Sequence, residues 1–202
     1  MNLRTELPTA ENSGNFNAVA DAVTKAGTTL ENLKAAVAGE TGSSAKYAAF
    51  AKAAKEQGFD QLARLWEATS AAEQIHINLE ASLVEAEDPS YTRPTAEAPA
   101  PEAIDLNLIA SANGEIFETS DMYPTFIKKA QEEGHAKAVK VFTRAKLAEA
   151  VHAEKYLEAY NNIDAADDDA YYLCPGCGDI HKGDDFEKCP ICGVPKAKFQ
   201  RF

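Results

Sequence analysis

Two glutamate–histidine pairs are the first residues in this sequence whose types and spacing could do chemistry. Glu73-x-x-His76 and Glu149-x-x-His152 lie 76 residues apart. Residues three apart lie on one face of a helix, so each pair offers a carboxylate oxygen and an imidazole nitrogen to the same point. These donors suit iron or manganese, whereas Cu(I) prefers sulfur ligands. The pairs therefore indicate a metal site, provided that further carboxylates converge on them.

Two further glutamates, Glu40 and Glu115, meet that condition. Glu40 lies 18 residues before Gly58, and His76 lies 18 residues after it. If this glycine ends a helical hairpin, a rise of about 1.5 Å per residue places both side chains roughly 27 Å from the turn. In the second hairpin, Glu115 lies nearly as many residues before Gly134 as His152 lies after it. All six side chains are therefore predicted to converge on one layer.

Apolar stripes of spacing three and four predict that these side chains face a core. Buried carboxylates repel one another and lose several kcal/mol each in hydration, so a buried cluster needs opposing charge. A lone Glu-x-x-His pair on an alanine-rich helix would be uninformative, but two pairs matched by two inward glutamates predict bound metal ions. The stripes contain Leu33, Val37, Glu40, Ser44 and Tyr47; Leu62, Trp66, Thr69, Glu73, His76 and Leu83; Leu108, Ala112 and Glu115; and Ala138, Phe142, Ala145, Glu149, His152 and Tyr156.

An internal repeat indicates how the chain carries these stripes. Helices are predicted over 28–58, 60–85, 104–134 and 135–161, so two helical hairpins are joined by the proline-rich stretch 85–103. One glutamate from each of two helices, with Glu-x-x-His from the other two, is the ligand set of ferritin-like di-iron bundles. We therefore expect a ferritin-like four-helix bundle over 28–162. Residues 1–27 are expected to be an N-terminal extension with a short helix within 15–27.

The two copies of the repeat differ by one inserted residue, and a glutamate without a counterpart lies near the insertion. Tyr47 matches Tyr123 at an offset of 76, whereas Glu40 matches Glu115 at 75, so the second copy contains one inserted residue. Glu118 follows Glu115 by one turn, and the equivalent residue of the first copy is a serine. This spare carboxylate would let one metal exchange ligands as its charge changes. The alternative interpretation is an ordinary solvated residue.

Two CxxC turns near the C-terminus form a second candidate metal site. They are Cys174-Pro175-Gly176-Cys177-Gly178 and Cys189-Pro190-Ile191-Cys192-Gly193. Four thiolates in a tetrahedron bind zinc, which would be structural, or iron, which would carry single electrons. The motif alone favours zinc, but a neighbouring redox-type bundle that needs electrons favours iron. The other two histidines, His135 and His181, are not expected to be bundle ligands.

Composition limits the remaining functions. Of 202 residues, 38 are alanine, the best helix former, and 45% are hydrophobic and 26% charged, as in a soluble globular protein. A net charge of -12 argues against nucleic acid and against an acidic membrane surface. Neither a membrane-spanning stretch nor a secretory signal is expected, so we expect a cytoplasmic location.

These motifs together resemble the rubrerythrin family over nearly the whole chain. The match differs from the family in a longer N-terminus before Thr28, a proline-rich crossover and a slightly shorter gap of 11 residues between the cysteine pairs. The matching motifs are Gly39-Glu40 with Tyr47, Glu73-x-x-His76, Gly114-Glu115-x-x-Glu118 with Met122-Tyr123-Pro124, Glu149-x-x-His152, and a rubredoxin-like segment over 171–202 with Ile180-His181-x-Gly183 and Pro195-Lys196-x-x-Phe199.

The resemblance implies an all-α four-helix ferritin-like bundle with a small C-terminal rubredoxin-like domain, whose four cysteines hold one iron. It implies a di-iron peroxidase that reduces hydrogen peroxide to water in oxidative-stress defence. In a homodimer, the rubredoxin-like domain of one chain would approach the di-iron site of the other. One iron would move between Glu118 and His76, and Tyr47 and Tyr123 would orient ligand carboxylates. The implied metal ligands are Glu40, Glu73, His76, Glu115, Glu118, Glu149 and His152, with Cys174, Cys177, Cys189 and Cys192 in the second site.

Two other functions remain open from the residues alone. Ferritin-like bundles also serve as iron oxidases or storage proteins, although storage has no obvious need for an electron carrier. A non-enzymatic metal-binding module, with zinc at the cysteines, is the other. The sequence also leaves open the external electron donor, either rubredoxin or an NAD(P)H-dependent reductase, and whether the crossover exchanges hairpins between two chains.

Overall fold

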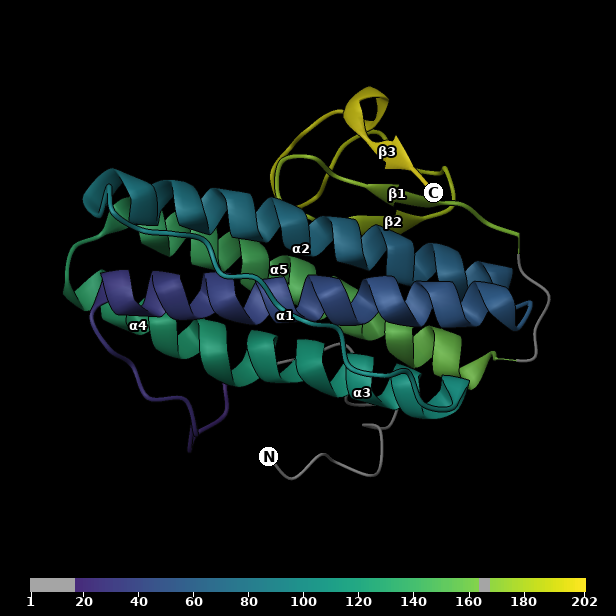
Figure 1. Ribbon diagram of the computed structural model, residues 1–202. Coiled ribbons are helices and arrows are strands. Elements are labelled where there is room, and N and C mark those ends of the chain that lie inside the picture. The colour runs from purple at the N-terminus through teal and green to yellow at the C-terminus, as the bar shows by residue number, and fades with distance from the viewer. Residues whose placement is uncertain (1–16, 164–167) are drawn as a thin grey trace.

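The computed structural model describes residues 17–163 and 168–202, and its main body is a bundle of long helices (Figure 1). The four helices predicted from the sequence are confirmed to within two residues at each end, and the four-helix fold is confirmed with them. The helices are α1 (Thr29–Glu56), α2 (Asp60–Glu87), the continuous rod of α3 (Ile104–Phe117), the π-helix η2 (Glu118–Met122) and α4 (Tyr123–Glu132), and finally α5 (Ala136–Asn161).

Local sequence explains where the helices begin and end. Thr28 and Glu31 form a capping box at the start of α1, in which each side chain accepts from the other residue's backbone N–H. Gly58 and Gly134 end the first helix of each hairpin with φ of +82° and +70°. Such left-handed conformations favour glycine because it has no Cβ to clash with the backbone.

The π-helix η2 accounts for the inserted residue in the second copy of the repeat. It occupies Glu118–Met122, between Glu115 and Tyr123, which is where the repeat offset changes from 75 to 76. A one-residue insertion into an α-helix is accommodated as a single wide π turn, and such turns are frequent at functional sites. Here the wide turn begins at Glu118, the residue that breaks the symmetry.

The short helix predicted within 15–27 is absent from residues 17–27, which is a correction; residues 15 and 16 lie outside the described residues. This segment instead runs without regular structure over η2. The Asp121 carboxylate accepts hydrogen bonds from the backbone N–H groups of Val23 and Thr24, at 2.7 and 2.9 Å. Ser120 O accepts from Val19 N at 2.9 Å. These long-range bonds satisfy backbone groups that a local helix would otherwise have paired.

The two hairpins turn at opposite ends of the bundle, and residues 88–103 cross its length between them (Figure 1). Two large apolar clusters, with a smaller third one beside them, lie in the described interior of the bundle. One includes Phe50, Trp66 and Tyr156, and the other includes Phe126 and Phe142. Because the glutamates and histidines lie between these clusters along the helices, apolar packing closes the polar layer from both ends.

A small antiparallel sheet follows the bundle and packs on α2 and α5 (Figure 1). Its strands are β1 (Tyr171–Leu173), β2 (Ile180–Lys182) and β3 (Gln200–Arg201), in the order β2-β1-β3, and a 3-10 helix η3 (Lys196–Lys198) precedes β3. Within the described residues, no helix combines the length and apolarity needed to cross a membrane.

Candidate metal centre

The predicted glutamates and histidines meet in the middle of the bundle as two overlapping groups of possible ligands. Within each group, one ligand atom from every residue lies within 4.8 Å of all the others. The first group is Glu40, Glu73, His76 and Glu149, and the second is Glu73, Glu115, Glu149 and His152. Because Glu73 and Glu149 belong to both groups, they lie where carboxylates could bridge two ions.

Burial and unpaired atoms test whether these residues fit two metal ions. All six side chains are at most 1% exposed. The atoms without a hydrogen-bond partner include both carboxylate oxygens of Glu149 and Nδ1 of His152. Glu149 lies 2.8 Å from Nδ1 of both histidines, but neither contact has the angles of a hydrogen bond. Buried polar atoms without partners are rare, and here they converge, so the donor set fits bound cations.

The electrostatics of the layer agree with this fit. Burial raises the pKa of Glu40 well above its usual range, and repulsion from Glu118 adds to the effect. Burial, with repulsion from Glu73, raises the pKa of Glu115 to about 8. Burial alone would also raise the pKa of Glu149, but the facing His76 and His152 lower it overall. In the absence of metal, protons would therefore supply the positive charge that metal ions supply when bound.

We predict that the metal-free protein loses thermal stability as pH rises from about 5 to about 9. Folding raises the pKa of Glu115 from 4.5 to about 8, so its contribution is complete below pH 4.5 and is lost as pH rises through 8. Burial lowers the pKa of His76 and His152, but Glu149 raises it overall, so both histidines change stability in the same direction. Calorimetry of chelated protein should show Tm falling by several degrees. The iron-loaded protein is the control and should show a weaker slope; a Tm that rises over this range in the metal-free protein would contradict the prediction.

Two buried tyrosines join the hairpins through the ligand carboxylates. The Tyr47 hydroxyl on α1 donates to Oε1 of Glu115 on α3, and the Tyr123 hydroxyl on α4 donates to Oε1 of Glu40 on α1. Both are very short contacts between fully buried side chains. A hydrogen bond from outside the ligand set fixes the orientation of a carboxylate and tunes its basicity. Both tyrosines therefore contact carboxylates that the resemblance gives as metal ligands, and their role in orienting these ligands stays a prediction.

Glu118 lies beside the centre, outside both ligand groups. Its side chain is 7% exposed, which excludes the solvated alternative, and its Oε2 has no hydrogen-bond partner. Burial raises its pKa well above the usual range, repulsion from Glu115 adds to this, and Lys46 opposes it. Glu118 is therefore available as an additional ligand, and the structure places it on the π turn.

Sequence reasoning missed a further buried carboxylate, Glu80. It lies on α2, is fully buried, and its Oε1 is 2.9 Å from the Tyr123 hydroxyl. The sequence contained a pattern that could have identified it, because Glu80 follows Glu73 and His76 at helical spacing on the same inward stripe. The repeat obscured it, since the equivalent residue of the second copy is Tyr156.

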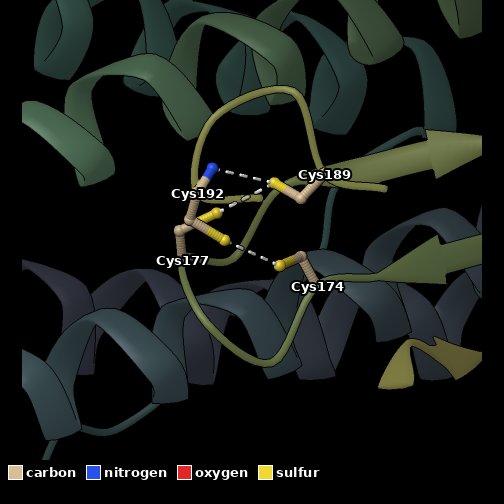
Figure 2. Close-up of side chains that lie close together, drawn as sticks. All are labelled: Cys174, Cys177, Cys189 and Cys192. Atoms are coloured by element: carbon tan, nitrogen blue, oxygen red, sulfur yellow. Dashed lines mark hydrogen bonds between the residues drawn. The ribbon is translucent and has the colours of Figure 1, made fainter. Parts of the chain in front are cut away.

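The four cysteines gather into the second predicted site (Figure 2). The Sγ–Sγ distances are 3.4 Å for Cys174 and Cys192 and 3.5 Å for Cys177 and Cys189. A disulfide would need about 2.05 Å, whereas a tetrahedral ion with 2.3 Å bonds needs roughly 3.8 Å. Hydrogen bonding from Cys177 lowers the pKa of the Cys174 thiol to about 6. The hydrogen bond with Cys174 raises the pKa of the Cys177 thiol, and burial raises that of Cys189 to about 12. The geometry fits tetrahedral ligation, in which a bound cation would stabilise all four thiolates.

The sequence profile named "Rubrerythrin" matches residues 31–160, and the profile named "Rubrerythrin, rubredoxin-like domain" matches residues 172–200. The chain belongs to the rubrerythrin family. As a member of that family, it carries a di-iron site in the bundle and a rubredoxin-type iron site at the four cysteines, and the donor sets described above fit both. Rubrerythrin-family proteins are oxidoreductases.

Relatives of this rubrerythrin-family chain match all or most of its length. It is 66% identical to nigerythrin of Nitratidesulfovibrio vulgaris over 202 residues, covering 100% of both chains. It is 33% identical to the rubrerythrin of the same organism over 184 residues, which cover 87% of this chain and 95% of that one. A solved structure titled as the fully reduced, all-ferrous state of nigerythrin has a TM-score of 0.91, with 100% of both chains covered.

The rubredoxin-like domain contacts the di-iron ligands of its own chain. Nε2 of His76 lies 3.0 Å from Cys177 O, and Nε2 of His152 lies 2.8 Å from Gly178 O. Because a carbonyl only accepts, Nε2 carries a hydrogen in each case. Nδ1, which faces the carboxylate of Glu149 in both histidines, is then the nitrogen that could bind a metal. The resemblance implied that this domain approaches the di-iron site of the other chain of a dimer; within this chain it contacts the ligands of its own bundle, and the approach between chains stays a prediction.

Proposed function

We propose that this protein is a peroxidase that reduces hydrogen peroxide to water at the di-iron site, with electrons supplied through the four-cysteine iron. The observation that carries the proposal is the hydrogen bond between His76 and the Cys177 carbonyl, which links a ligand of one site to a ligand of the other. Titles of solved nigerythrin structures name fully reduced, partially reduced and mixed-valence states, so that relative changes redox state.

The number of electrons that peroxide reduction needs matches the number that the di-iron site can supply. Reduction of one peroxide to two waters consumes two electrons and two protons, and a di-iron centre supplies two electrons as each iron changes its charge by one. Glu73 and Glu149 would bridge the ions, while Glu40 with His76 and Glu115 with His152 would hold one ion each. Tyr47 and Tyr123 would fix the orientation of the terminal carboxylates.

Glu118 would serve the change in redox state. Its carboxylate is buried, lies close enough to Glu40 and Glu115 to interact with their charges, and has an unpartnered oxygen. An anionic ligand stabilises the more highly charged ferric ion more than a neutral imidazole does. We therefore propose that one iron is held by Glu118 when oxidised and by His76 when reduced, and that Lys46 stabilises the released carboxylate.

The remaining parts of the proposal concern partners. An external reductant, either rubredoxin or an NAD(P)H-dependent reductase, would reduce the cysteine iron, whose Cys192 is partly exposed. The protein would act in the cytoplasm as a homodimer in oxidative-stress defence. Iron storage is less well supported, because an electron-carrier domain in contact with the di-iron ligands has no part in storing mineral.

Reaction of the reduced protein with the two candidate oxidants tests the proposed activity. We expect fully reduced, iron-loaded protein to be oxidised by hydrogen peroxide at least tenfold faster than by dioxygen at equal concentration, because the proposed substrate is peroxide. Anaerobic stopped-flow absorption would follow both reactions. Faster oxidation by dioxygen would favour an iron oxidase, and a shell of many subunits in native mass measurement would favour storage.

A further inference from the structure

Glu80 is a fully buried carboxylate that the proposed mechanism does not use. It belongs to neither ligand group and lies one helical turn beyond His76 on α2. The Tyr123 hydroxyl lies 2.9 Å from its Oε1, and its Oε2 has no hydrogen-bond partner. Among the described residues, no ion pair reaches Glu80. Burying a carboxylate without an opposing charge is strongly unfavourable, so this position requires an explanation.

Counting protons at Tyr123 supplies that explanation. A phenol has one hydrogen, yet the Tyr123 oxygen is in hydrogen-bond contact with Oε1 of Glu40 and with Oε1 of Glu80. Tyr123 can donate to only one of them, so the other contact is satisfied only if that carboxyl carries a proton and donates to the phenol oxygen. Glu40 belongs to a ligand group, so bound metal ions would favour its anionic form. In the part of the chain that the structure describes, no positively charged group forms a hydrogen bond or ion pair with Glu80.

The other half of the centre offers a built-in comparison. There Tyr47 donates to Glu115, and the residue equivalent to Glu80 is Tyr156, whose ring centroid lies 5.6 Å from that of Tyr47. No carboxyl group stands at this position in the second half. The extra hydrogen bond therefore acts on one side of the centre only, the side of Glu40 and His76.

We propose that Glu80 is a positioning residue for the iron held by Glu40. As a carboxylic acid it donates to the Tyr123 oxygen, which commits the single Tyr123 hydrogen to Glu40 and fixes that carboxylate toward the metal. Burial raises the pKa of Glu80 to about 8, which agrees with a protonated side chain. The proposal rests on the di-iron centre but not on peroxide as its substrate.

Two substitutions separate the donated hydrogen bond from simple packing. In the iron-loaded protein, Glu80→Gln should remove the infrared carbonyl band of a protonated carboxyl but leave the Mössbauer spectrum unchanged, because the amide N–H still donates to Tyr123. Glu80→Leu should remove the same band, change the Mössbauer signal of one iron and release that iron to a chelator roughly tenfold faster.

A matched variant and the contrary outcomes complete the test. Tyr47→Phe should change the signal of the other iron and leave the infrared band in place. An infrared band that persists in Glu80→Gln shows that Glu80 is not the protonated group and overturns the proposal; if Glu80→Leu does not fold, this measurement still decides. A Mössbauer spectrum of Glu80→Leu identical to that of the wild type overturns it equally. None of these measurements uses peroxide, so failure of the proposed activity would leave them interpretable.

Discussion

Glu149→Gln should empty both halves of the di-iron site and lower peroxidase activity by more than roughly 100-fold. Changing a residue that only hydrogen-bonds to a metal ligand lowers activity by up to about 100-fold, and the loss of a ligand itself should exceed this. Glu149 belongs to both ligand groups, and both of its oxygens lack hydrogen-bond partners. A neutral amide offers one oxygen and no charge, so it cannot balance two cations. Iron analysis and the peroxide-dependent oxidation rate would measure the effect.

Two further variants serve as controls for the effect of Glu149→Gln. Glu154→Gln, at an exposed position of the same helix, should retain both irons and full activity. Glu40→Gln should weaken one iron more than the other, since Glu40 belongs to one ligand group only. Retention of two irons per chain by Glu149→Gln would show that this carboxylate does not bridge, and the proposed ligand arrangement would have to be abandoned.

Gly178→Ala should slow electron transfer from the four-cysteine iron to the di-iron site by roughly 100-fold, the loss typical of a misplacement of about 1 Å. A Cβ at Gly178 would overlap Nε2 of His76, so the loop would have to withdraw from the bundle. Withdrawal breaks the hydrogen bonds that join Cys177 to His76 and Gly178 to His152. Stopped-flow reoxidation of the reduced cysteine iron, followed by its visible absorption, would measure the rate.

Gly193→Ala is the matched control for this variant. Gly193 follows the second cysteine of the other CxxC turn and has the same φ of +80°, but a Cβ there meets nothing within 4 Å. Both variants therefore carry the same backbone strain, and only one disturbs the contact with the bundle. Both should keep all their iron. Equal rates in the two variants would mean that the contact within one chain is not the electron path, and would favour transfer between chains.

The sequence was sufficient for the ligand layer and for the helices that carry it. Helical periodicity places Glu73 with His76 and Glu149 with His152 on inward stripes, and periodicity is a local property that needs no knowledge of tertiary contacts. The repeat then located Glu40 and Glu115. It also revealed the inserted residue, although only the structure shows that this residue forms a π turn beginning at Glu118.

The tertiary structure alone decided what reaches the layer from elsewhere in the chain. The pairing of Tyr123 with both Glu40 and Glu80 joins three helices, and no local pattern specifies which side chains meet across a bundle. The extended course of residues 17–27 is likewise set by Asp121, about 100 positions away. The contact of Cys177 with His76 also joins the small cysteine domain to the bundle. Sequence spacing fixes which face of a helix a residue occupies, whereas the partner on that face depends on how the helices and the small domain pack together.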